Sequence, residues 1–374
     1  MAEPSAAAVR EVMSLLRDAH AFSGGRVGSE LPARHVPFDQ LTGRHLFEEA
    51  IAREWRTGST VVVRGESGTG KSSVVEFVLG EGEEEFLPIR MRLGQRREVG
   101  AVTEPADFAR ELARVITRMA QDVTGQTRMG VEQAARSQDR GRRDRAGISF
   151  NLGLIRIDLA TEVEKVARVQ GELDDVDRAL TLLDVLREDG RHVVLVLDDL
   201  DQFFASEIQG EEAATIRAAF MKRIVRFLPE LRTAVVIAAQ PRHTEGGAWR
   251  DAQDFVNLVV DIPGLPDVAA VRRILERRIE VSLGTVAEAS PPTTPGGGRH
   301  ATPPSGDRPS ISPREWLDAI FEPAALEELF RVSRNSSNRM RNMLTAADRA
   351  LGLTVDEGGA RVSEGAVRAA AAVL

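Results

Sequence analysis

Residues 59–79 read STVVVRGESGTGKSSVVEFVL, and this stretch decides the fold. The apolar run that ends at Gly65 predicts a strand buried on both faces, and SSVVEFVL predicts a helix. Between them, GESGTGKS (65–72) matches the pattern G-x-x-x-x-G-K-[ST]. A strand before this motif and a helix after it form the setting in which such a loop cradles phosphate groups. The segment therefore predicts a site for the phosphates of a nucleotide.

Each residue type in this segment has a part in phosphate binding. The glycines let the backbone turn tightly, so that successive N–H groups and the helix N-terminus face phosphate oxygens. Lys71 is expected to reach the β and γ phosphates, and the Ser72 hydroxyl is expected to ligate Mg²⁺. Only three of the 49 basic residues are lysines, which argues against an incidental match. The predicted phosphate-binding residues are Gly65, Glu66, Ser67, Gly68, Thr69, Gly70, Lys71, Ser72 and Ser73.

A second chemical element follows the apolar run VVLVL (193–197), where the chain reads DDLD (198–201). Phosphate transfer needs a carboxylate near Mg²⁺ and a group that orients or deprotonates the attacking water. We predict that Asp198 holds the metal through water and that Asp199 is the general base. The sequence leaves two roles open for Asp201, a supporting acid near the metal or a side chain that only faces solvent. A solvated acidic strand end explains DDLD alone, and its pairing with the phosphate loop favours the catalytic interpretation.

Five buried-strand runs alternate mostly with helical patterns along the chain. They are STVVVRG (59–65), EFLPIRMRL (85–93), RHVVLVLDD (191–199), TAVVIAA (233–239) and NLVVDIP (257–263). This order predicts the α/β class, with a five-stranded parallel sheet flanked by helices. Beyond Gly264 the strands stop and helical patterns continue, which predicts a C-terminal helical lid domain.

The pattern predicts an N-terminal helix and linker (1–45), a nucleotide-binding domain (46–263) and the lid domain (264–374). Residues 124–170 are treated as an insertion, which explains the long separation between the phosphate loop and DDLD. Its basic stretch favours a solvated face over a contact with nucleic acid or a subunit, because arginines and aspartates alternate there: Arg140, Arg142, Arg143 and Arg145 with Asp139 and Asp144. Residues 284–313, rich in Pro, Gly, Ser and Thr, predict a disordered loop within the lid domain.

The composition predicts a soluble, cytoplasmic protein. Of its 374 residues 42% are hydrophobic and 28% charged, which suffices for a substantial core. No apolar run is long enough for a membrane span, and the N-terminus does not resemble a secretory signal. The absence of cysteine excludes disulfides, thiolate metal sites and cysteine nucleophiles. A net charge of −8 does not favour nucleic acid or anionic lipid as partners, although a local basic patch stays compatible with nucleic-acid binding.

On these motifs the chain resembles the AAA+ and STAND superclass of ATPases, and within it the branch of origin-recognition, ExeA-type, KAP and NACHT ATPases. GESGTGKS resembles the Walker A motif and VVLVLDD the Walker B motif, and the LDDLD form (197–201) is more similar to KAP and STAND members than to conventional AAA+ machines. The resemblance covers most of the chain and implies ATP and Mg²⁺ as cofactors. QLTGRH (40–45) is similar to the family's Gly-Arg element, which implies Thr42, Gly43 and Arg44 near the adenine.

The resemblance also assigns residues that read the γ-phosphate. TAVVIAAQPR (233–242) ends with Gln240 at the sensor 1 position, and Arg242 is the alternative reader. A polar strand terminus explains the same residues without that role. SRNSSNRMRNMLTAADRAL (333–351) resembles the G-N-x-R sensor 2 segment with serine in place of glycine. We favour Arg339 over Arg341 as its arginine, while a surface ion pair is the simpler use of either.

These assignments predict a Mg²⁺-dependent ATPase whose lid moves with nucleotide state and changes the surface offered to another copy of the chain or to a partner protein. ATP is preferred over GTP because no N/T-K-x-D guanine reader follows a late strand. In such enzymes an arginine of a neighbouring subunit often completes the site. The sequence does not choose among the candidates Arg223, Arg226, Arg232 and Arg250.

Other functions stay open at this stage. A slowly hydrolysing signalling switch or scaffold, in defence or regulation, differs from the ATPase by ATP-dependent assembly without rapid turnover. A DNA-associated loader or transposition-type ATPase is disfavoured by the acidic charge and the lack of a winged-helix pattern. A small-molecule kinase is disfavoured by the tandem aspartates and the helical lid.

Overall fold

A computed structural model describes residues 4–23, 31–43, 46–92, 99–137, 163, 174–198, 200, 211–289, 311–336 and 339–374. The chain divides into two compact units. The sheet unit comprises Phe47–Gly65 and Lys71–Ile262, and the helical unit comprises Met1–Leu46, Glu66–Gly70 and Pro263–Leu374. The phosphate loop thus begins and ends in the sheet unit, whereas its middle, Glu66–Gly70, groups with the helical unit.

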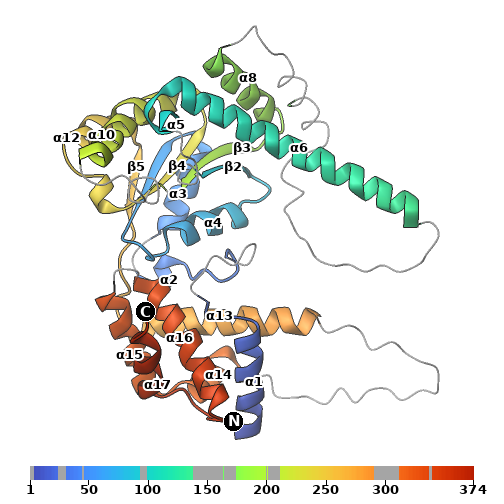
Figure 1. The fold of residues 1–374 in the computed structure, drawn as a ribbon, viewed down its shortest axis with the longest axis vertical. Helices are drawn as coiled ribbons and strands as arrows, with labels where there is room; N and C mark the ends of the chain where they lie inside the picture. Colours follow the sequence, from blue (N-terminus) through green and yellow to red (C-terminus); the bar gives the residue numbers. More distant parts are fainter. Residues whose placement is uncertain are drawn as a thin grey trace. The chain divides into compact units, whose positions relative to one another are not determined.

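The sheet unit is built on five parallel strands (Figure 1), as the sequence predicted. Their order in the sheet is β2-β3-β4-β1-β5. The strands are β1 (Thr60–Arg64), β2 (Phe86–Arg92), β3 (His192–Asp198), β4 (Ala234–Ala239) and β5 (Leu258–Asp261). β4 is buried along its whole length and lies between β1, which precedes the phosphate loop, and β3, which ends at Asp198. The two chemical motifs therefore follow strands that are separated by one other strand.

Helices cover both faces of this sheet. They are α3 (Phe47–Arg56), α4 (Lys71–Glu81), α5 (Gly100–Thr103), α6 (Pro105–Ser137), α8 (Asp175–Arg187), α10 (Glu211–Ala219), α11 (Val225–Phe227) and α12 (Gly247–Ala252). One face packs against α6, α8 and α10–α11 through alternate strand residues such as Ile89, Leu195 and Ile237. On α3, Trp55 is fully buried, and its ring meets that of Phe86 edge-on with centroids 5.5 Å apart.

Two helical stretches of the sheet unit differ in detail from their sequence patterns. α6 continues without a break to Ser137, so the start of the predicted insertion is a continuation of this helix. Most of the insertion, including its basic stretch, lies outside the described residues. The helical stretch between β3 and β4 contains a π-helical turn, Phe220–Ile224, between α10 and α11. Such turns are rare, and periodicity alone does not reveal them.

The helical unit joins the N-terminal helix to the C-terminal helices. Its elements are α1 (Ala6–Asp18), α2 (Phe38–Thr42), α13 (Val268–Ala289), α14 (Pro313–Ile320), α15 (Pro323–Asn335), α16 (Arg339–Asp356) and α17 (Glu364–Ala371). α1 packs against α13, α14 and α16. α13 continues to Ala289, so residues 284–289, where we expected the loop to begin, are helical. Ser312 and Glu315 form a capping box that fixes the start of α14.

An arginine whose Nε is buried holds the segment that follows α1. Arg278 of α13 donates hydrogen bonds to the carbonyl oxygens of Ala21 (3.1 Å) and Ser23 (2.9 Å). Burial, together with repulsion from Arg34, lowers the pKa of Arg278 to about 10. Asp348 of α16 faces the same cluster, and burial raises the pKa of its carboxyl group. These contacts tie α1 to α13 and α16. No described helix is long and apolar enough to cross a membrane.

Candidate nucleotide-binding site

The middle of the phosphate loop has a backbone conformation that requires glycine. Gly68 and Gly70 have φ values of 70° and 103°, in the left-handed region that L side chains rarely adopt. Thr69, buried between them, donates to the Glu66 carbonyl from its backbone nitrogen (3.3 Å) and from Oγ1 (2.9 Å). The segment is thus folded on itself immediately before α4 begins.

Lys71 opens α4 and turns back toward the start of the loop. Its Nζ donates to the carbonyl oxygen of Gly65 at 2.8 Å, and the side chain is buried. The backbone nitrogen of Gly65 in turn donates to the Ala239 carbonyl at the end of β4 (3.2 Å). The first turn of α4 contains no acidic residue. A buried ammonium group at a helix N-terminus without nearby helical carboxylates is an environment that attracts anions.

The strand register brings three of the predicted residues to one edge of the sheet. Val62 of β1 and Leu197 of β3 are both in register with Ile237 of β4. Because the strands are parallel, Asp198 at the end of β3 and Gln240 just after β4 lie at the same edge as the start of the phosphate loop. Asp198 and Gln240 are half-buried. Asp199 and Asp201 lie outside the described residues.

The sheet unit offers oxygen ligands of the kind that Mg²⁺ prefers. Ser72 and Ser73 stand half-buried in the first turn of α4, and Asp198 ends β3. Within the described ranges, no group of three or more His, Asp or Glu side chains could hold a metal by itself. Mg²⁺ in nucleotide sites takes few protein ligands and completes its shell with phosphates and water. A hydroxyl and a carboxylate therefore fit Mg²⁺ that arrives with a nucleotide.

Gly43, in the segment 40–45 that was predicted to lie near the adenine, is explained by the local backbone structure. Gly43 follows α2 with φ at 72°, and its backbone nitrogen donates to the Asp39 carbonyl at 2.6 Å. Thr42 Oγ1 donates to the Phe38 carbonyl at 2.7 Å. A left-handed helix end favours glycine whatever the ligand. Arg44 lies outside the described residues, so the assignment of this element to the base stays a prediction.

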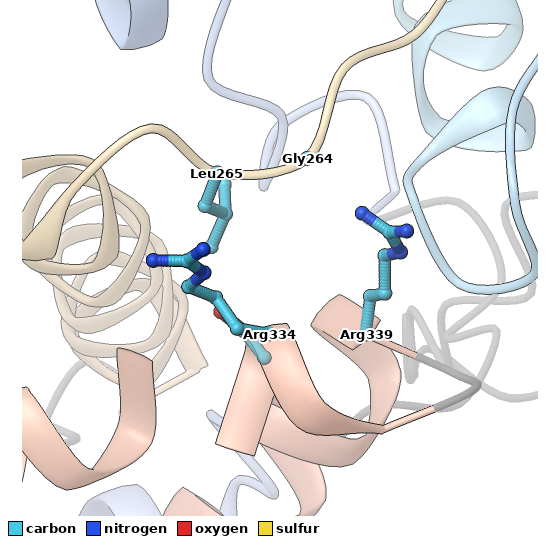
Figure 2. A pocket seen from close by; sticks show the side chains of 5 residues that line it. Gly264, Leu265, Arg334 and Arg339 are labelled. Carbon is cyan, nitrogen blue, oxygen red and sulfur yellow. The ribbon is translucent and has the colours of Figure 1, made fainter. Parts of the chain in front are cut away.

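Two arginines line a cavity of about 260 Å³ in the helical unit, together with Gly264, Leu265 and Ser333 (Figure 2). Arg339 is the first residue of α16 and is half-buried, whereas Arg341 is exposed and does not line the cavity. The other arginine is Arg334 of α15, which our sequence analysis did not single out. The only signal available was its place in the arginine-rich segment SRNSSNRMR (333–341).

The four candidates for a subunit-bridging arginine are distinguished by their contacts in the sheet unit. Arg223 forms an ion pair with Glu104. Arg226 lies over the ring of Phe255, 5.5 Å from its centroid. Arg232 ends a 3₁₀ turn with φ at 50°, and its carbonyl accepts a hydrogen bond from Arg187 (2.8 Å). Arg250 of α12 is exposed, and its guanidinium group has no polar partner among the residues that the structure describes.

The strand order, together with a phosphate-loop motif between β1 and α4, defines a P-loop type of α/β fold followed by C-terminal helices. No family model matches this sequence, and none of the curated proteins matches it.

Solved structures similar to this chain include the Aeropyrum pernix ORC2 protein in its ADPNP–ADP complexes, with 14% identity, a TM-score of 0.45 and coverage of 87% of this chain and 66% of that one. The Aeropyrum pernix ORC1 protein in complex with DNA has 16% identity and a TM-score of 0.45, over 92% of this chain and 69% of that one. A chain of the E. coli MS115-1 HORMA:CdnC:Trip13 complex has 12% identity and a TM-score of 0.31, over 97% and 88%. This chain thus spans about two thirds of the two origin-recognition proteins.

Proposed function

We propose that this chain binds ATP through GESGTGKS and hydrolyses it with the help of Mg²⁺. The observation that carries the proposal is the conformation of the loop and its lysine. Gly68 and Gly70 adopt the left-handed φ values that such a loop needs. Lys71, the first residue of α4, keeps its ammonium group 2.8 Å from the Gly65 carbonyl. A phosphate group offers that ammonium a charged acceptor, and charge-assisted hydrogen bonds are the stronger ones.

The residues at the edge of the sheet supply the remaining steps in this proposal. Ser72 and Asp198 hold the metal, which when bound neutralises charge on the phosphates. Asp199 accepts the proton of the attacking water, as its position after Asp198 in the sequence suggests. Gln240 orients that water or the γ-phosphate, with Arg242 as the alternative reader. Arg339 of the lid responds to the phosphates and couples nucleotide state to lid motion and to assembly.

Among the candidates for a trans-acting arginine, we favour Arg250. It is exposed, and no described residue engages its guanidinium group, whereas Arg223 and Arg226 are engaged by Glu104 and Phe255. An arginine that has to reach a neighbouring subunit is best left without a partner in its own chain. This choice makes assembly of several copies part of the proposed activity.

A slowly hydrolysing switch is the second candidate function. It is favoured by a hydrogen bond between the phosphate loop and the lid, from the Met340 backbone nitrogen to the Gly68 carbonyl (3.1 Å). Such a bond lets loop occupancy influence α16 without any turnover. The two functions differ in rate, because a switch assembles with ATP and Mg²⁺ but releases phosphate slowly.

Two isosteric variants test the division of roles. Asp199→Asn should leave the affinity for Mg²⁺-ATP within about twofold and slow phosphate release by at least about 100-fold, because general bases contribute about 10² to 10⁴ in rate. Asp198→Asn should instead raise the Mg²⁺ concentration needed for half-maximal turnover. An unchanged turnover rate in Asp199→Asn, measured by phosphate release, would move the base to another residue.

A further inference from the structure

The described residues that line the cavity in the helical unit include two positive charges and no negative one. Its side walls are Arg334, near the end of α15, and Arg339, at the start of α16, and Gly264 and Leu265 of the connection between β5 and α13 lie above them. Figure 2 shows the two arginine side chains on opposite sides of the opening beneath this connection. Among the described residues that line the cavity, none is a carboxylate. The described part of its wall is therefore concave, with two guanidinium groups and no counter-charge.

These two arginines differ from several others in the helical unit that form ion pairs. Arg272, Arg331 and Arg368 are ion-paired with carboxylates. For Arg334 and Arg339, the described part of the chain provides no such partner. Arg334 lies over the ring of Phe330, 5.9 Å from its centroid. Two unpaired guanidiniums that face one cavity repel each other, and an anion between them removes that repulsion.

Gly264 makes room for one of these groups. A Cβ atom at Gly264 would lie 2.8 Å from Nη1 of Arg339, closer than atoms can approach without a shift. Nη1 is the far end of a flexible side chain, so an alanine here displaces the guanidinium rather than the backbone. Gly264 has no left-handed φ, and alanine therefore fits its backbone without strain. Gly264 is thus a positioning residue for Arg339.

The size of the cavity restricts the ligand. At roughly 30 Å³ per water molecule, about 260 Å³ holds about nine waters. The cavity fits a single phosphate-sized group with some water, and planar guanidiniums match phosphate oxygens in bidentate pairs. We propose that this cavity binds a phosphate-class anion, with Arg334 and Arg339 as its two ligands and Gly264 keeping Arg339 in place.

The anion has two conceivable sources, which titrations of the full chain distinguish. One is free inorganic phosphate; the other is the terminal phosphate of ATP, in which case the inference rests on the proposed function. Calorimetric titrations with phosphate, ATP and ADP compare the wild type with Arg334→Ala, Gly264→Ala and Lys71→Ala. Arg341→Ala is the matched control. Arg341 is an exposed arginine of α16, the helix that begins with Arg339, and it does not line the cavity.

If free phosphate is the ligand, its affinity falls at least about tenfold in Arg334→Ala and Gly264→Ala, the loss of one charge-assisted contact, and is unchanged in Lys71→Ala and Arg341→Ala. If ATP supplies the anion, the two cavity variants weaken ATP at least about tenfold and ADP much less. Phosphate, ATP and ADP affinities that all stay within about twofold of wild type in both cavity variants would overturn the inference. Lys71→Ala with wild-type ATP affinity would instead contradict the proposed function, and the phosphate titration still tests the cavity.

Discussion

The backbone nitrogen of Met340 donates a hydrogen bond to the carbonyl oxygen of Gly68 at 3.1 Å. Met340 is the second residue of α16, and Gly68 lies in the middle of the phosphate loop. The side chain of Met340 also covers the loop, since its Cε lies 3.9 Å from the position that a Cβ at Gly70 would take. The loop segment Glu66–Gly70 and the start of a lid helix are therefore directly connected. We infer that a change in the loop is felt by α16.

The Met340 amide should exchange slowly with solvent in nucleotide-free protein. The first N–H groups of a helix lack an intrahelical acceptor, so Gly68 is what protects this one. Ala324, the second residue of α15, has no such acceptor in the described part of the chain and is the control. We expect about fivefold slower exchange at Met340, as one net hydrogen bond of about 1 kcal/mol implies. Equal exchange at the two positions, after correction for intrinsic rates, would show that the bond is not formed in solution.

Replacing Arg278 should destabilise the helical unit. Arg278→Met leaves the carbonyls of Ala21 and Ser23 without their donor and removes a buried positive charge near Asp348. We expect a loss of about 2–4 kcal/mol in the free energy of unfolding, measured by urea denaturation. Arg277→Met is the control, because Arg277 lies on the same helix, is more exposed and donates to the Ala33 carbonyl. Similar losses of unfolding free energy in both variants would mean that Arg278 contributes no more to stability than the more exposed Arg277.

The Arg64–Asp261 pair should make a small, acid-sensitive contribution to stability. Arg64 donates to both Asp261 oxygens, at 2.5 and 2.6 Å, across β1 and β5, and this holds the pKa of the Asp261 carboxyl below its ordinary value. A folded pKa below the unfolded one means that the pair stabilises above about pH 4 and loses this effect as the pH falls through the folded pKa.

Since the Asp261 side chain is 63% exposed, Asp261→Asn should cost less than about 1 kcal/mol at pH 7. The difference in unfolding free energy from wild type should shrink toward pH 3. Asp254→Asn, at an exposed position without an ion pair among the described residues, controls for the loss of a surface charge. A difference that stays constant from pH 7 to pH 3 contradicts the ionic origin of the contribution.

Arg250→Ala should abolish the concentration-dependent part of ATP turnover. If Arg250 acts on a nucleotide held by a neighbouring copy, its loss should slow turnover by about 10³-fold or more while ATP affinity changes little. Arg223→Ala is the matched control, since Arg223 is paired with Glu104 in its own chain. Turnover measured over a range of protein concentrations checks this. A larger effect of Arg223→Ala than of Arg250→Ala would reverse the choice.

The sheet could be predicted from the sequence because each strand is a short apolar run with polar flanks. VVVR, VVLVLD and AVVIAA become β1, β3 and β4, and the glycines of GESGTGKS have the φ values that the motif demands. The position of Lys71 at the first residue of α4 also follows from the motif. Such local patterns are fixed by backbone chemistry and burial, which the sequence shows directly.

The missed features depend on contacts between distant segments. Arg334 was not predicted because its place in the same cavity as Arg339 and Gly264 depends on how α15, α16 and the segment after β5 pack together. The bond between Gly68 and Met340 joins residues far apart in the chain through backbone atoms, which have no residue signature. The hydrogen bonds from Arg278 to the carbonyls of Ala21 and Ser23 were not predicted for the same reason. An arginine on a helix is predicted to be solvated unless its surroundings are known.

The most direct test of the central proposal is phosphate release from Mg²⁺-ATP by the full chain, with Lys71→Ala measured alongside. Removing the ammonium group that now binds the Gly65 carbonyl should lower ATP affinity at least about tenfold, because a charge-assisted contact to phosphate is lost. Our account predicts phosphate release by the wild type that exceeds that of Lys71→Ala. A variant that binds and hydrolyses ATP as well as the wild type would contradict it.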